Sequence, residues 1–222
     1  MRQLRFALLG AGCALALSAT AANALVSVSS TAGPDTGPRA GETKIIDFDP
    51  TLEAGVSIVG DYAITNASVV GIAASPLGDA TNFLTVPNAT IPGSATMTFT
   101  SFLGGDVTGF SFYWGSIDTY NTLELLNRSG VVIGTFTGAG FPPANGDQGA
   151  GATNRRVAFD LTGSDQQLGG LRFTSSQFAF ESDTFSFSVV PEPATWGLMI
   201  MGFGGLGAML RSNRRRQAPV AV

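Results

Sequence analysis

The chain contains no histidine and one cysteine among its 222 residues. Histidine is the commonest general base, the commonest zinc ligand and the usual activator of a serine nucleophile, so its absence excludes most catalytic designs. The cysteine, Cys13, lies in an apolar stretch near the N-terminus, and the remainder of the chain can form no disulfide. The sequence therefore predicts a protein without catalytic residues, metal centre or cofactor.

Positive charge is scarce in the middle of the chain. Six of the 12 basic residues lie at the two ends, so residues 25–189 hold six basic residues against 15 acidic ones, a formal charge of −9. Nucleic-acid binding depends on Lys and Arg displacing counterions from phosphates, and an acidic domain repels that backbone. Nucleic acid is therefore excluded as a partner. The length of this segment suits one domain.

The first 24 residues have the three parts of a secretory signal. These parts are the basic residues Arg2 and Arg5, the apolar residues 6–17, and the small residues Ala22 and Ala24. We expect cleavage after Ala24. An uncleaved membrane helix would need about 20 apolar residues, and a lipoprotein signal at Cys13 would need a different spacing.

The C-terminal end contains a second apolar stretch. Residues 194–210 carry no charge, and as a helix they would span about 25 Å, the short limit for crossing a membrane. A basic cluster follows, and positive flanks stay on the cytoplasmic side. Its members are Arg211, Arg214, Arg215 and Arg216. We expect a transmembrane sorting helix with the large domain outside.

Two prolines precede this stretch. Pro191 and Pro193 disfavour a helix before residue 194 and hold Glu192 in an extended, accessible strip. Trp196 suits the membrane interface, where amphipathic rings are enriched. The many glycines beyond it make a poor permanent anchor. The pattern indicates a transient anchor that another membrane protein handles.

In this order of parts, residues 190–216 resemble the PEP-CTERM sorting domain in its PEPxxW form. The motif residues are Pro191, Glu192, Pro193 and Trp196. The resemblance implies recognition and cutting by exosortase, a membrane-embedded protease of bacteria that often make exopolysaccharide. Similar tails also occur on some proteins labelled ice-binding. The resemblance implies an exported protein, with an inner-membrane intermediate, that reaches the cell surface or the extracellular space.

Between the two ends, large apolar residues alternate with small polar ones, and turn residues recur every 8–12 positions or so, as in all-β sandwiches and barrels. Alternation is strict in 95–100, 110–112, 157–161, 178–180 and 185–189, which places the phenylalanines on one face. Residues 123–133 read as a hairpin with a turn at 127–130. We expect one all-β domain, a jelly-roll-like β-sandwich.

The predicted organisation has five segments: a signal peptide at 1–24, a flexible leader at 25–43, the β-sandwich at 44–189, a sorting and anchor segment at 190–216, and a tail at 217–222. A second loop, at 138–154, is rich in glycine. Loops of this length are either functional or disordered, and the sequence does not choose between them.

The segment 112–123 is the most distinctive of the domain, and it resembles a segment that recurs in exosortase-dependent surface proteins. In one interpretation Trp114 or Tyr120 stacks on a sugar ring while Asp118 and Asn121 bond its hydroxyls. In the other, Trp114 fills the core and the polar pair ties a turn. The second interpretation is favoured, because aromatic side chains in sandwiches are mainly core.

Carboxylates are the remaining catalytic option. Asp47 and Asp49 flank Phe48 on an expected strand, so they would point to the same side. With Glu53 or Asp160 they would bind Ca²⁺ or form a glycosidase pair. Acidic surfaces often contain such pairs without a function.

Three functions follow from these patterns. The leading hypothesis is a non-catalytic surface or extracellular-matrix protein that is associated with polysaccharide. The second is a glycan hydrolase using two carboxylates. The third is a self-associating adhesive or structural protein whose Phe-rich strands pair with neighbours.

Overall fold

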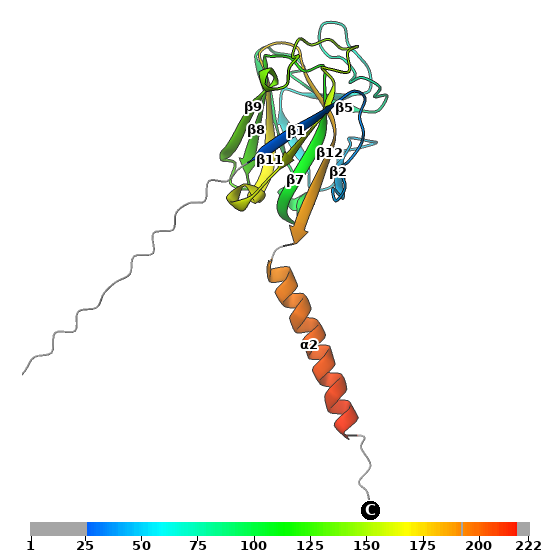
Figure 1. Cartoon of the computed structure of the whole chain (residues 1–222), viewed down its shortest axis with the longest axis vertical. Helices are drawn as coiled ribbons and strands as arrows, with labels where there is room; N and C mark the ends of the chain where they lie inside the picture. The colour runs from blue at the N-terminus through cyan, green and yellow to red at the C-terminus, as the bar shows by residue number, and fades with distance from the viewer. Residues whose placement is uncertain (1–25, 192, 217–222) are drawn as a thin grey trace, which may run out of the picture.

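A computed structural model describes residues 26–191 and 193–216. It shows two β-sheets packed face to face, followed by a helix that extends away from them (Figure 1). One sheet contains, in spatial order, β1 (Ser27–Ala32), β10 (Arg155–Asp160), β7 (Gly105–Gly115), β12 (Phe180–Pro191), β5 (Phe83–Val86) and β4 (Ala63–Thr65), with β2 (Lys44–Ile46) also paired to β12. The predicted β-sandwich is confirmed.

The second sheet contains, in spatial order, β3 (Ser57–Gly60), β6 (Gly93–Thr98), β11 (Leu168–Ser175), β8 (Asn121–Asn127) and β9 (Val132–Thr137). The short helical elements are α1 (Thr100–Leu103), η1 (Gly138–Gly140) and η2 (Gly163–Gln167), and the long helix is α2 (Pro193–Arg216). From β5 onward, successive strands mostly alternate between the two sheets, so β5-β12-β7-β10 faces β6-β11-β8-β9. This is the strand order of a jelly roll.

The core between the sheets is a stack of aromatic rings. Phe110, Phe112 and Trp114 alternate along β7 and are fully buried, as the period-two pattern predicts. Phe112 stacks on Phe185 of β12 with ring centroids 5.0 Å apart. Trp114 stacks on Phe180 at 4.3 Å. Offset stacking adds to the energy that burial alone supplies.

The predicted hairpin also forms. β8 and β9 pair antiparallel, and the turn between them ends at Gly130, whose φ is +78°. The side-chain oxygen of Asn127 accepts hydrogen bonds from the backbone of Ser129 and Val131, each 2.9 Å long. Asn127 thus closes the turn with its side chain and Gly130 accepts the positive φ, as the sequence predicts.

The segment expected to be a flexible leader, residues 25–43, forms part of the sandwich in the structure. Ser27–Ala32 is strand β1 and pairs antiparallel with β10. Farther along, Asp35 accepts two hydrogen bonds from Arg156, 2.9 and 3.0 Å long, and Glu42 is buried against Ser111 at 2.6 Å. The segment is therefore attached by the ladder of β1 with β10, by the packing of Val26 against the core and by these polar contacts.

At the other end, α2 follows β12 directly. Five glycines lie within it, and glycine contributes little apolar surface. Among the described residues, no helix is long and apolar enough to cross a membrane, which differs from the expectation of a transmembrane helix at 194–210.

The ring stack predicts a large effect of Trp114 on stability. Trp114→Ala should lower the free energy of unfolding by about 3–5 kcal/mol, because it empties the space between Phe112, Phe141 and Phe180. Trp114→Phe should cost less, since most ring contacts stay and the buried indole nitrogen has no hydrogen-bond partner among the described residues. Urea denaturation followed by circular dichroism measures both. An alanine variant as stable as the parent would contradict the core assignment.

Candidate functional site

The C-terminal segment follows directly on β12, a central strand of the first sheet. The last pairs of β12 with β7 are Val190 with Asp106 and Pro191 with Gly105. Helix α2 then begins at Pro193, a position where proline is tolerated because its missing N–H has no partner in a helix. Glu192, between the two prolines, lies outside the described residues. Pro191, which the sequence places in an extended, accessible strip, is therefore the last paired residue of β12.

The other predicted residues of the two terminal segments lie as follows. Trp196 is half exposed on the first turns of α2, and Arg211 is exposed farther along. Arg214, Arg215 and Arg216 form the last residues of the same helix. Ala22 and Ala24, which mark the expected signal cleavage, lie outside the described part of the chain.

The structure brings the four residues of the distinctive segment to one end of the sandwich, but Trp114 and Asn121 are both fully buried there. Asn121 donates to the carbonyl of Ala179 at 3.2 Å and accepts from the hydroxyl of Ser175 at 2.8 Å. Its amide therefore ties the start of β8 to neighbouring segments. A sugar platform that uses Trp114 is incompatible with this burial.

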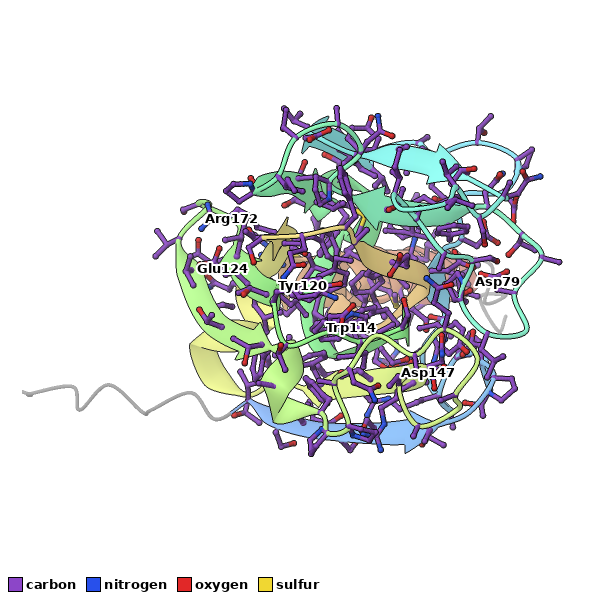
Figure 2. The ribbon with its side chains drawn as sticks, turned by 90° about the horizontal axis from the view of Figure 1, so that it is seen from above. Asp79, Trp114, Tyr120, Glu124, Asp147 and Arg172 are labelled. Carbon is purple, nitrogen blue, oxygen red and sulfur yellow. The ribbon has the colours of Figure 1, made fainter. Side chains whose placement is uncertain are left out.

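Tyr120 and Asp118 are only partly buried, and Figure 2 shows Tyr120 near the middle of this end of the molecule. The hydroxyl of Tyr120 donates to the carbonyl of Phe178 at 3.0 Å. Asp118 forms an isolated backbone bridge with Asn145 in the long loop. Burial raises the pKa of the Asp118 carboxyl, while a hydrogen bond with Tyr120 opposes the rise. These two side chains thus connect the turn to the loops around it.

The glycine-rich loop 138–154 is held in place by hydrogen bonds. Gly146 donates to the carbonyl of Ile117 at 3.1 Å, and Ile117 donates to the carbonyl of Thr153 at 2.8 Å. The amide oxygen of Asn154 accepts from Leu77 and Ser116, each at 3.0 Å. The structure therefore shows an ordered covering for one end of the sandwich.

Beside this end lies a cavity of about 290 Å³, lined by residues 68–73, Gln148, Phe178, Ala179 and Glu181. Glu181 comes from β12 and is 2 % exposed. Its two carboxylate oxygens accept from the backbone of Ala74 at 3.0 Å and from the hydroxyl of Ser116 at 2.9 Å. The cavity thus combines a carboxyl, an amide and the half-buried ring of Phe178, which lies before β12 rather than in the expected strand 178–180.

Burial changes the chemistry of Glu181. Removal from water raises its pKa to about 8, and the nearby charge of Asp118 adds to the rise, although the two hydrogen bonds oppose it. Near neutral pH the group is mostly a neutral carboxylic acid, able to donate as well as accept hydrogen bonds. Sequence reasoning missed Glu181; its position next to Phe180 in a buried strand is the signal that could have found it.

The carboxylates singled out in the sequence, Asp47, Asp49 and Glu53, meet at a turn and do not lie along one strand. Strand β2 ends at Ile46, and Phe48 has a φ of +64°, so Asp47 and Asp49 flank a turn rather than lie on one strand. Asp49 accepts from the side chain of Asn82 at 2.6 Å. Asp47 contacts Glu53 through its backbone N–H at 3.3 Å.

Asp160, the other expected partner, belongs to β10, where it accepts from Arg39 at 3.0 Å. In addition, no group of three or more acidic or thiol side chains in the described residues is arranged to hold a metal ion. Sequence reasoning placed the acids on one strand because it could not see the left-handed turn at Phe48.

Comparison with known proteins identifies the C-terminal segment. Residues 189–216 match the family described as the PEP-CTERM protein-sorting motif. The chain carries a PEP-CTERM sorting segment. This segment begins inside β12 and includes all of α2, so the PEP-CTERM boundary falls within the last strand of the sandwich.

The central domain is compared with solved structures and curated proteins separately. One solved structure, CsCBM6-3 from Clostridium stercorarium in complex with cellobiose, aligns with 17% identity and a TM-score of 0.37, covering 70% of this chain and 100% of that one. No curated protein matches. The PEP-CTERM segment is therefore the part of the chain with an assigned family motif.

The buried Glu181 predicts a pH-dependent stability. Its pKa is raised to about 8 in the folded state, against about 4.3 in the unfolded chain. The folded state therefore binds the proton more strongly, and the stability that this supplies is complete below pH 4 or so and is lost as the pH rises through about 8. Glu181→Gln should flatten the decline in urea midpoint between about pH 5 and 9.

Glu124→Gln is the matched control for this measurement, because Glu124 lies in the other sheet and pairs with Arg172 at 2.6 Å on the surface. It should leave the slope unchanged. Equal slopes in the parent and in Glu181→Gln would show that the carboxyl titrates normally.

Proposed function

We propose that this protein is a non-catalytic surface or extracellular-matrix protein that an exosortase-type protease sorts during export. The observation that carries the proposal is the PEP-CTERM motif at residues 189–216. The motif implies export through the membrane, processing by exosortase and delivery to the cell surface or beyond. In this proposal the precursor is held at the inner membrane by its C-terminal segment until it is processed.

The junction between sandwich and motif supports a processing event at the edge of the folded domain. Pro191 still pairs with Gly105, and α2 begins two residues later. A protease that acts at the motif therefore works close to the end of a paired strand. The prolines disfavour continuation of the helix into this junction and keep it available.

The sorting proposal predicts that three alanines in place of Pro191, Glu192 and Pro193 leave export intact but block processing. Alanines let the helix extend toward the domain and remove the carboxylate that a protease would grip. Mass spectrometry of the C-terminus in fractionated cells measures the result. The variant should remain with the membranes as intact precursor, whereas parent protein from the surface should lack its C-terminal end.

Two controls separate sorting from general damage. Pro219→Ala changes a proline beyond the matched residues and should be processed normally. Replacing the four terminal arginines should instead release intact precursor, because the basic stop is weakened. Parent protein from the surface that still ends at Val222 would show that the segment is only an anchor.

We also propose that the cavity beside Glu181 binds part of a surface polysaccharide. Support comes from its lining, in which an amide (Gln148), a ring (Phe178) and a carboxyl group (Glu181) meet the segment 68–73. Pockets that bind small molecules combine apolar walls with a few placed polar groups. We infer binding rather than hydrolysis at this cavity, since Asp47, Asp49 and Glu53 gather at a turn outside its lining.

Binding at this cavity is tested on glycan arrays with the exported protein. Gln148→Ala should weaken binding about tenfold, the effect of losing one or two hydrogen bonds to a neutral ligand, and no sugar should be released. Gln177→Ala, an exposed neighbour outside the lining, is the control. Equal binding by parent and Gln148→Ala would exclude this cavity, and release of sugar would favour the hydrolase.

A further inference from the structure

A second buried acid, Asp183, lies two residues beyond Glu181 on β12. Asp183 is 3 % exposed, and it lines a cavity of about 240 Å³ together with Asp35, Asp79, Thr81 and other residues. Asp79 comes from the loop before β5, which Figure 2 shows at the edge of the sandwich. Two carboxylates from distant parts of the chain thus line the same cavity.

Each carboxylate has one bonded oxygen. Oδ1 of Asp79 accepts from the backbone and the hydroxyl of Thr81, at 2.8 and 2.5 Å. Oδ2 of Asp183 accepts from the hydroxyl of Thr184 at 3.0 Å. These bonds fix the orientation of both groups.

The other oxygen of each carboxylate accepts no hydrogen bond from an N–H or O–H group of the described residues. These atoms, Oδ2 of Asp79 and Oδ1 of Asp183, are inaccessible to solvent, and the two carboxyls lie within hydrogen-bonding reach of each other. A buried polar atom without a partner costs free energy, and a charged one costs more. Two such oxygens at one cavity indicate that the site is built for something besides the chain itself.

The charges around the cavity leave an excess of negative charge. The cavity has three acids, Asp35, Asp79 and Asp183, but Asp35 is already paired with Arg156. The hydroxyl of Tyr113 donates away from the acids, to the carbonyl of Leu77 at 2.8 Å. The described residues that line the cavity include no Lys or Arg to pair with Asp79 and Asp183.

We propose that Asp79 and Asp183 bind one divalent cation, Ca²⁺, through their unpartnered oxygens. Ca²⁺ takes six to eight oxygen ligands in flexible geometry, including carboxylates, carbonyls and water. Two carboxylates match its charge, and the cavity has room for water ligands. Since no third free acid is available among the described residues, the remaining ligands are neutral oxygens, which fits the weak, millimolar sites of extracellular proteins.

A proton shared by the carboxyls of Asp79 and Asp183 is the alternative to Ca²⁺ at this site. Burial raises the pKa of Asp183 to about 8, and both the charge of Asp79 and a hydrogen bond between the two carboxyls add to the rise. A proton between the two free oxygens would satisfy both at neutral pH, whereas Ca²⁺ would displace it. The two occupants therefore differ in how stability responds to Ca²⁺ and to pH.

The test uses the exported protein, purified with a chelator, in thermal unfolding at pH 7.5 with and without about 5 mM Ca²⁺, above the range of weak extracellular sites. Ca²⁺ should raise the unfolding temperature of the parent, because it binds the folded state. Asp183→Asn and Asp79→Asn should each abolish that rise. Mg²⁺ should give a smaller rise, because it dehydrates reluctantly and demands octahedral geometry.

Both asparagine variants should fold, because asparagine keeps an oxygen for the threonine hydroxyls and removes the repulsion between the acids. Without Ca²⁺ they should be at least as stable as the parent. Glu124→Gln, in the other sheet, should keep the full response to Ca²⁺. A parent whose unfolding temperature does not respond to Ca²⁺ would overturn the proposal, as would a response that survives in both variants. The shared proton would then be recognised by a gain in stability at low pH that Asp183→Asn removes and that Glu181→Gln leaves in place.

Discussion

The rest of the structure depends on the pairing of β12 within the first sheet. This strand lies between β7 and β5 and also pairs with β2, so its backbone is hydrogen-bonded along most of its length. Its inward residues, among them Phe180, Phe185 and Phe187, supply rings to the core. The ladder shifts between Asp183 and Ser186, and this irregularity keeps phenylalanines facing inward on both sides of it. One strand thereby organises the core, the buried acids and the start of the sorting segment.

The outer face of the same sheet is polar, yet it is covered. Arg156 on β10 donates to the hydroxyl of Ser111 on β7 at 3.0 Å and to the carbonyl of Thr184 at 3.1 Å. From the N-terminal segment, Asp35 accepts from Arg156 and Glu42 accepts from Ser111. Covering such groups is favourable only when they are hydrogen-bonded, because a buried charge without partners is costly. This network satisfies the requirement at Arg156. At Asp79 and Asp183 the described residues supply no donor to one oxygen of each carboxylate, and we therefore propose a bound cation there.

The sequence is informative where structure depends on neighbours along the chain. Alternation of phenylalanine with serine predicts the strands around Phe112 and Phe185, and Asn127 with Gly130 predicts a turn, because period and positive φ are local properties. The contacts that cover the outer face of the first sheet join residues far apart in the sequence. Arg156 meets Asp35 across 121 positions, and Glu181 meets Ala74 across 107, so neither the leader's attachment nor the two cavities follow from spacing. The serines opposite the core rings were the available signal, since small side chains on an outer face permit another segment to lie on it.

The position of the PEP-CTERM motif links folding to sorting. The strand that leads into the motif is complete only when it pairs with β7 as far as Pro191 and Gly105, and β7 in turn carries the rings on which β12 packs. A chain that has crossed the membrane unfolded presents the motif on a free segment, whereas a folded chain presents it beside the end of β12. The prolines suit both states, because they resist helix and need no ladder hydrogen bond of their own. Formation of the first sheet therefore determines whether a protease meets the motif on a free chain or next to a folded domain.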